Sequence, residues 1–180
     1  MADYDVFNGD ADGICSLIQL RLNEPKESVL ITGVKRDIKL LQKVEAQKGD
    51  SVTVLDISME KNIAALSGLL ASRVSVFYAD HHRSGEIPQS QLLDAHIDLS
   101  PDTCTALIVD RYLKGQYRAW SLTAAFGDNL KKEATEIAKT SGFGQEQIVL
   151  MDELGTYINY NGYGASLDDL FYPPAELYKI

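Results

Sequence analysis

The stretch Val74-Ser75-Val76-Phe77-Tyr78-Ala79-Asp80-His81-His82-Arg83 decides the fold of this 180-residue chain. It begins with a short apolar and β-branched run, typical of a buried strand, and ends in a carboxylate beside two imidazoles. Two earlier apolar runs end in a similar way, one before Asp10-Ala11-Asp12-Gly13 and the other before Asp56. Strands that finish in such side chains predict a site at one edge of a sheet.

Short apolar runs alternate with amphipathic windows in the first half of the chain, which predicts a parallel sheet covered by helices. We expect strands over residues 4–7, 29–33, 51–55, 74–78 and 95–99. We expect the first helix to begin near Asp12 or Gly13 and two more to span residues 37–46 and 61–72. After Pro101 the pattern is helical throughout, over residues 103–113, 119–126, 131–139 and 145–158. The predicted fold class is α/β, with a mostly parallel five-stranded sheet, helices on both faces and an all-helical C-terminal part.

The length and composition are those of one ordinary globular domain, since 45% of the 180 residues are hydrophobic. No apolar run approaches the roughly 18 residues needed to span a bilayer, and the acidic N-terminus does not resemble a secretory signal. We therefore expect a soluble, cytoplasmic protein with no membrane partner. Cys15 and Cys104 are expected to be reduced, buried thiols.

The formal net charge of -9 argues against a protein that coats long nucleic acid, because such binders normally carry a basic face. Inward-facing carboxylates can nevertheless form a phosphate site once divalent cations occupy them. The charge therefore predicts that a metal mediates any contact with a phosphate substrate.

The acidic and imidazole side chains are expected to share one pocket, because ligands of open parallel sheets gather beyond the carboxyl ends of the strands. Asp10, Asp12, Asp56, Asp80 and His81 all follow predicted strands. Imidazole mixed with carboxylates suits Mn(II), with Mg(II) or Zn(II) as further candidates. One ion cannot use all these carboxylates, and two ions about 3.5 to 4 Å apart form a centre that hydrolyses phosphate esters and anhydrides. We therefore expect two divalent cations.

Four motifs between Asn8 and Asn129 resemble those of the DHH phosphoesterases, a family named for the triplet present here as Asp80-His81-His82. The first motif, Asn8-Gly9-Asp10-Ala11-Asp12-Gly13, has the form typical of the RecJ-like nuclease branch. The second and fourth motifs are Val54-Leu55-Asp56-Ile57-Ser58 and Ala125-Phe126-Gly127-Asp128-Asn129. The resemblance implies a metal-dependent phosphoesterase domain.

The resemblance also implies a role for each motif residue. The ligands implied for the first metal are Asp10 and Asp56. The ligands implied for the second metal are Asp12, Asp56, His81 and Asp128. His82 would lie beside the substrate phosphate, and the expected catalytic residues are Asp56, Asp80 and His82.

Two features near the motifs concern the first metal and the phosphate. Family members usually have a histidine or aspartate ligand just upstream of the paired aspartates, where this chain has Asn8. Asn8 can coordinate only as a neutral amide, so we expect the first metal to be weakly held. Lys35-Arg36 resembles the place where nuclease relatives keep a phosphate-contacting arginine, which makes Arg36 an expected substrate contact. Arg83 is a competing anion contact.

Residues 1–160 are the expected catalytic domain, and residues 161–180 read as a turn-rich connector. The family resemblance implies that such a connector leads to a C-terminal substrate-binding domain, which would lie outside this sequence.

The expected activity is hydrolysis of a phosphodiester by two-metal activation of water. Its substrate would be a small phosphate-containing molecule or short single-stranded nucleic acid, such as an oligonucleotide, a nucleotide or a single-stranded end. A pyrophosphate or polyphosphate hydrolase is one alternative, although such relatives favour serine where this chain has Gly13. A non-catalytic, nucleotide-binding regulatory domain is another, because the upstream ligand is missing.

Overall fold

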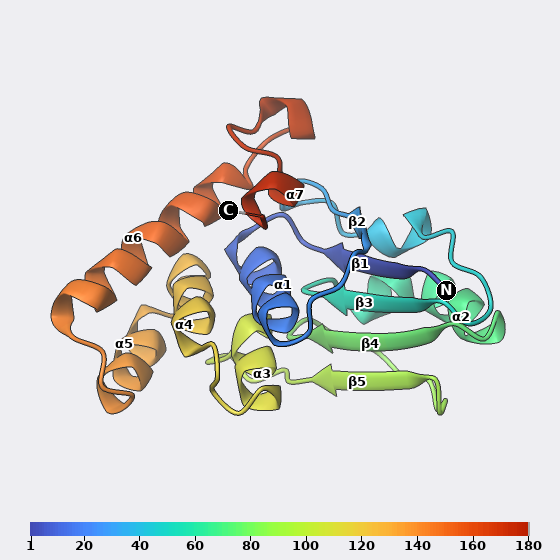
Figure 1. Ribbon diagram of the computed structural model, residues 1–180, viewed down its shortest axis with the longest axis horizontal. Helices are drawn as coiled ribbons and strands as arrows, with labels where there is room; N and C mark the ends of the chain where they lie inside the picture. Colours follow the sequence, from blue (N-terminus) through green and yellow to red (C-terminus); the bar gives the residue numbers. More distant parts are fainter. Residues whose placement is uncertain (180) are drawn as a thin grey trace.

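Five parallel strands form the central sheet of the computed structural model, which describes residues 1–179 (Figure 1). The strands are β1 (Asp3–Phe7), β2 (Val29–Ile31), β3 (Ser51–Leu55), β4 (Ser75–Asp80) and β5 (Leu93–Ile97). Their order across the sheet is β2-β1-β3-β4-β5, and each neighbouring pair is parallel. The predicted five-stranded sheet is confirmed, although β2 ends before residue 33 and the fifth strand spans 93–97 rather than 95–99.

The helical elements agree with most of the sequence-based boundaries. The longer helices are α1 (Ala11–Asn23), α2 (Met59–Ala71), α3 (Thr105–Tyr112), α4 (Arg118–Gly127), α5 (Lys131–Thr140) and α6 (Gln145–Asn161). The short ones are η1 (Leu40–Lys43), η2 (Leu167–Asp169) and α7 (Pro174–Leu177). The predicted all-helical part after the last strand is confirmed (Figure 1).

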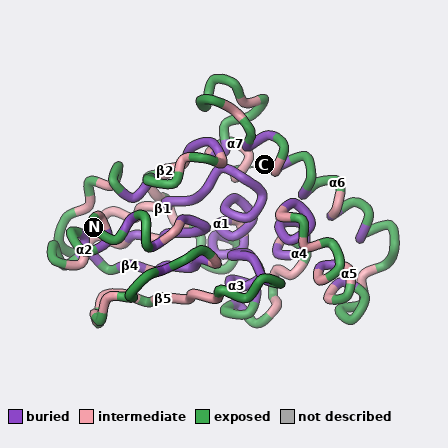
Figure 2. Tube along the Cα trace, turned by 180° about the vertical axis from the view of Figure 1, so that it is seen from behind, coloured by how far each residue is buried: buried purple, intermediate pink, exposed green. Residues whose placement is uncertain are grey.

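Helices cover both faces of the sheet because successive strand residues point to opposite sides. One core cluster joins α1, α3, α4, α5 and α6 to the strand residues Phe7, Leu55 and Ala79. The other joins α2 and η1 to the strand residues one position earlier, Val6, Val54 and Tyr78. Figure 2 shows the trace buried through α1 and exposed over the loop that follows α6.

The order of the strands places a crevice between β1 and β3. From β1 the chain moves to β2 on one side, and it then crosses to β3 on the other side of β1. Loops leaving two such strands diverge at their carboxyl ends, which leaves a crevice where ligands bind in sheets of this type. Asn8 and Asp56 directly follow β1 and β3, so the first and second motifs lie at this crevice.

The helix predicted over residues 37–46 is wrong, because only the single turn η1 forms there. The Asp37 side chain accepts a hydrogen bond from the Val34 N–H, and the Ile38 carbonyl accepts one from the Asn62 side chain instead of a helical N–H. Leu40 and Leu41 are both buried, so this segment supplies its apolar side chains to the core from one turn. Tertiary contacts here override the helical periodicity.

The segment after α6 packs against the body of the domain. Asn161 exchanges two hydrogen bonds with the backbone of Tyr172, and Pro174 is buried. The Tyr178 ring lies 6.4 Å from the Phe7 ring, at the end of β1. The function of residues 161–180 as a connector stays a prediction, and residue 180 lies outside the described part of the chain.

Both cysteines are free and buried, as predicted. None of the helices formed by residues 1–179 has the length and apolar character required to cross a membrane.

Candidate metal centre

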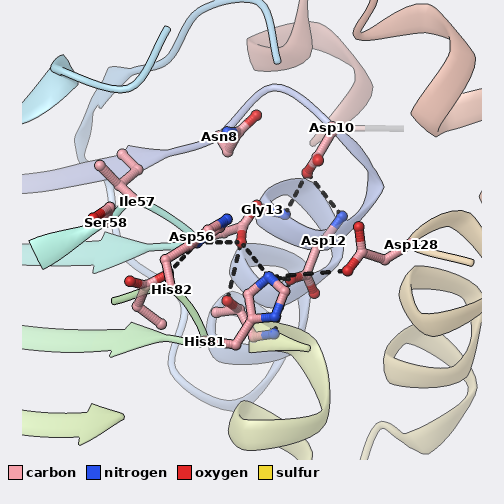
Figure 3. Close-up of polar contacts among 12 residues, drawn as sticks. Asn8, Asp10, Asp12, Gly13, Asp56, Ile57, Ser58, His81, His82 and Asp128 are labelled. Carbon is pink, nitrogen blue, oxygen red and sulfur yellow. Dashed lines mark hydrogen bonds and ion pairs between the residues drawn. The ribbon is translucent and has the colours of Figure 1, made fainter. Parts of the chain in front are cut away.

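Side chains from separate elements meet at the crevice (Figure 3). His81, directly after β4, lies among the others: its Nε2 is 3.5 Å from Asp56 Oδ1, 3.7 Å from Asp12 Oδ2 and 3.9 Å from Asp128 Oδ2. Asp12 is in the first turn of α1, Asp56 follows β3, and Asp128 follows α4. The structure therefore brings together the side chains predicted for the second metal.

The backbone at Asp56 turns sharply as it leaves β3. Its φ of 58° lies in the left-handed region, which aspartate and asparagine tolerate better than most residues. Its N–H donates to the Ala79 carbonyl of β4 at 3.1 Å, so the turn is held against the neighbouring strand. The carboxylate points into the crevice (Figure 3) and is 2% exposed.

The N-terminus of α3 orients two of the carboxylates. The backbone N–H groups of Thr105 and Ala106 donate to the two oxygens of Asp12, at 2.8 and 2.7 Å. The Thr105 hydroxyl donates to Asp56 Oδ1 at 3.1 Å. Free N–H groups at a helix start favour negative charge, so α3 helps to keep these buried carboxylates in place.

The charges of the cluster favour a cation. Burial raises the pKa of Asp56 well above its ordinary value, and Asp12, Asp10, Asp80 and Asp128 raise it further. Burial also raises the pKa of Asp128 to about 6, with further contributions from Asp12 and Asp10. The carboxylates thus repel one another, and a cation among them would relieve that repulsion.

The ligand atoms fit a divalent metal ion in number and type. Two groups of three such atoms lie within 4.8 Å of one another, namely Asp12, His81 and Asp128, and Asp56, His81 and His82. Carboxylate oxygens mixed with imidazole nitrogens suit ions such as Mn(II). The ligand atoms around His81 therefore fit a divalent metal ion.

His82 forms a pair with the buried carboxylate of Asp80. Its Nδ1 lies 2.7 Å from Asp80 Oδ1, and the His82 side chain is 47% exposed, whereas that of Asp80 is fully buried. The hydrogen bond that His82 donates to Asp80 raises the pKa of His82, burial opposes that rise, and the charges of Asp80, Asp12 and Asp128 add to it. The pair holds a partly exposed imidazole ring at the mouth of the site and favours its protonated form.

The ligands predicted for the first metal are engaged by protein groups. Asp10 Oδ1 accepts the N–H groups of Asp12 and Gly13, both at 3.1 Å, and thereby caps α1. Asp10 Oδ2 lies 2.7 Å from Lys35 Nζ. Asn8 Nδ2 donates to the Lys35 carbonyl at 3.1 Å. Figure 3 shows Asn8 and Asp10 to one side of the cluster around His81.

One of the two arginines predicted to contact substrate has a side-chain partner elsewhere in the chain. The Arg36 side chain donates to the Ala165 carbonyl at 2.7 Å and so contacts the segment after α6. For Arg83 the contacts are those of its backbone carbonyl, which accepts the Ser58 hydroxyl and the Glu60 N–H at the start of α2, so a substrate contact by its side chain stays a prediction. The positively charged side chain that contacts the carboxylates of Asp10 and Asp128 is that of Lys35 and not that of its neighbour Arg36.

Solved structures share this architecture. The chain is similar to exonuclease RecJ bound to manganese, with a TM-score of 0.56 and 18% identity over 89% of this chain and 53% of that chain. It is also similar to the DHH domain of a member of the s1p family of ribosomal proteins, with a TM-score of 0.61 and 14% identity over 88% of this chain and 47% of that chain. This chain has the DHH fold.

The DHH fold described here spans about half the length of these two solved chains. Comparison with the models of known protein families gives no match. Comparison with curated proteins gives none either.

Sequence reasoning missed two residues that support the site. Thr105, which donates to Asp56, could have been noticed as a threonine at a helix start after Pro101. Asn159 accepts a hydrogen bond from Lys35 Nζ at 2.8 Å, across 124 residues of sequence. No local pattern distinguishes Asn159 from the other polar residues of α6.

The site opens into a cavity of about 150 Å³, whose lining includes Asn8, Lys35, Ser58, His82 and Asp128. This is small beside the roughly 300 to 1,000 Å³ of pockets that enclose whole organic ligands. The cavity therefore has room for a phosphate group, while the rest of a larger substrate would lie outside it.

Proposed function

We propose that this DHH domain is a metal-dependent phosphoesterase that hydrolyses a phosphodiester in a short oligonucleotide, a nucleotide or a single-stranded end. The observation that carries the proposal is the convergence of three carboxylates on His81 at the crevice between β1 and β3. The shared fold with an exonuclease described as bound to manganese supports the same conclusion and favours Mn(II).

The residues that would hold a divalent cation are Asp12, Asp56, His81 and Asp128. A cation bound there supplies Lewis-acid chemistry, since it activates water for attack on phosphorus and neutralises charge on the phosphoryl oxygens. Thr105 and the start of α3 would keep two of the carboxylates oriented during the reaction. Such preorganisation lowers the cost of rearranging the site when charge develops.

His82 would act on the phosphate. Asp80 accepts a hydrogen bond at Nδ1, which leaves Nε2 of the imidazolium as the donor available to substrate. That N–H can bind a phosphoryl oxygen or give its proton to the departing alkoxide oxygen. The raised pKa of His82 favours the protonated form that either function requires.

The size of the cavity supports a substrate whose phosphate enters while its remaining parts stay outside. A cavity of about 150 Å³ would enclose the phosphate group. The remainder of the substrate would lie outside it, beyond the half-exposed His82 ring. This supports a phosphodiester within a larger molecule.

A metal-replacement assay tests the proposal. The protein is stripped of metal, loaded with Mn(II), Mg(II) or Zn(II), and assayed on dinucleotides, single-stranded oligomers, cyclic dinucleotides and pyrophosphate. We expect Mn(II)-dependent cleavage of a phosphodiester, and we expect Asp56→Asn to lower it by more than about 100-fold because a ligand is lost. Asparagine tolerates the left-handed backbone at this position, so the variant should still fold.

A matched control is His96→Gln, which changes a histidine on β5 that packs against Phe77 and Tyr112. Its activity should equal that of the unchanged protein. Hydrolysis of pyrophosphate alone would favour the anhydride hydrolase. Tight metal and nucleotide binding without turnover on any substrate would overturn the enzymatic proposal in favour of a regulatory domain.

A further inference from the structure

Lys35 occupies the side of the centre where the first metal was expected. Its ammonium nitrogen lies 2.7 Å from Asp10 Oδ2 and 3.7 Å from Asp128 Oδ1. Asp10 is a ligand predicted for the first metal, and Asp128 is one predicted for the second. A positive side chain therefore already stands between a carboxylate predicted for the first metal and one predicted for the second.

The Asp10 carboxylate already pairs with a positive charge of the protein. One of its oxygens accepts two N–H groups at the start of α1, and the other is in contact with Lys35. Removing those N–H contacts would leave the first turn of α1 without its cap. The Asp10 carboxylate thus caps α1 and forms an ion pair with Lys35.

Asn8 also contacts the segment that carries Lys35. Its amide group donates to the Lys35 carbonyl at 3.1 Å, which fixes the loop that carries the ammonium group. The remaining Asn8 oxygen is buried, has no hydrogen-bond partner among the described residues and carries no formal charge. A lone amide oxygen is a poor substitute for the carboxylate or imidazole that a divalent ion prefers.

Contacts with distant parts of the chain hold Lys35 in this position. Its N–H donates to the Gly162 carbonyl at 2.9 Å, and its ammonium group donates to Asn159 at 2.8 Å. The Tyr163 ring centre lies 5.7 Å from the ammonium nitrogen. The side chain is only 28% exposed, so it is a fixed part of the site and not a freely moving surface lysine.

We propose that this domain binds one divalent cation, at the cluster around His81, and that the Lys35 ammonium group takes the place of a second metal ion. The inference rests on the proposed function. It replaces the two divalent cations expected from the sequence by one. An ammonium group has three donors. Two of them are used by Asp10 and Asn159, and because Lys35 lines the cavity together with Asp128, the third would be available to a phosphoryl oxygen there.

Metal stoichiometry tests the inference without an activity measurement. The protein is dialysed against Mn(II), the bound ion is counted by elemental analysis, and its electron paramagnetic resonance spectrum is recorded. We expect one ion per chain, with the hyperfine pattern of an isolated Mn(II). Two ions per chain with the spectrum of an exchange-coupled pair would overturn the inference.

A double variant tests whether Lys35 fills a cation site. Lys35→Met removes the charge at similar length, and Asn8→Asp supplies a carboxylate, so the double variant should bind a second ion. Lys131→Met is the matched control, because Lys131 is 56% exposed and pairs with Asp152 away from the centre. It should keep one ion. Circular dichroism checks that each variant is folded.

The outcomes separate the inference from the proposed function. A double variant that is folded and still holds one ion would overturn the inference while leaving the phosphoesterase proposal intact. Absence of any bound ion in the unchanged protein would overturn both. One ion without hydrolysis of any substrate would overturn the proposed function only.

Discussion

Replacing Asp128 by asparagine should stabilise the metal-free protein at pH 8. Asp128 follows α4, its side chain is 23% exposed, and its pKa is raised to about 6 from an ordinary value of 3.8. Its carboxylate also lies near the negative end of the α4 dipole. The charged form is therefore less stable in the folded protein than in the unfolded chain, and the neutral amide removes that cost.

The raised pKa of Asp128 and its distance from Asp12 both indicate the size of the effect. A rise in pKa from 3.8 to about 6 corresponds to about 3 kcal/mol. Carboxylate oxygens of Asp12 and Asp128 lie within 4.8 Å, and two charges at that distance repel by about 3.5 kcal/mol at an effective dielectric constant near 20. Solvent screens part of this, so we expect a gain of about 1 to 2 kcal/mol, or about 2 to 8 °C in Tm for a domain of this size.

The gain should depend on pH. Because the pKa of Asp128 is higher in the folded protein, the folded state binds more protons than the unfolded chain between about pH 4 and pH 6. The stability contributed by this group therefore falls as pH rises through that window. Asp128→Asn should show its full gain at pH 8 and less than half of it at pH 4.5.

The assay is thermal unfolding with a chelator present, repeated with saturating Mn(II). Mn(II) should stabilise the unchanged protein more than Asp128→Asn, since a ligand bound only by the folded state adds stability. Asp94→Asn, at a carboxylate that is 62% exposed on β5, is the control and should change Tm little. A loss of stability for Asp128→Asn at pH 8, or a gain that does not vary with pH, would refute the reasoning.

Three further predictions concern the supports of the site. Thr105→Val removes the hydroxyl that donates to Asp56 and should weaken Mn(II) affinity about 10-fold, as measured by calorimetry. Asp80→Asn removes the carboxylate that raises the pKa of His82, so the alkaline limb of the pH profile of kcat/KM should move to lower pH. Gly127→Ala would place a methyl group 2.6 Å from a carbonyl oxygen of α6 and should cost about 1 to 3 kcal/mol in urea unfolding.

Each of these predictions has an outcome that would contradict it. Unchanged Mn(II) affinity in Thr105→Val would show that the hydroxyl does not support the site. An alkaline limb that stays in place in Asp80→Asn would exclude His82 as its origin. Gly68→Ala is the control for Gly127→Ala, because a methyl group at Gly68 meets no atom within 4 Å and should stabilise α2 by about 0.5 to 1 kcal/mol.

Local patterns along the chain were enough to predict the sheet and the meeting of Asp12, Asp56 and His81, whereas Asp128, which follows α4, was implied only by the family resemblance. Apolar runs before Asp56 and His81 marked the carboxyl ends of strands, and parallel pairing brings such ends to one edge. The helix predicted over residues 37–46 was wrong, and the Asn62 side chain binds the Ile38 carbonyl that such a helix would use. That competition depends on a residue of α2, so it cannot be read from the segment itself.

The amino-acid sequence by itself determined which chemical groups gather at the crevice, because strand periodicity and parallel topology fix where each motif emerges from the sheet. Tertiary structure alone decided which of those groups stay free to bind a ligand. Asp10 and Asp12 are two residues apart and look equivalent in the sequence. Asp12 faces His81, whereas Asp10 is paired with Lys35, which α6 and the residues after it hold in place from the far end of the chain.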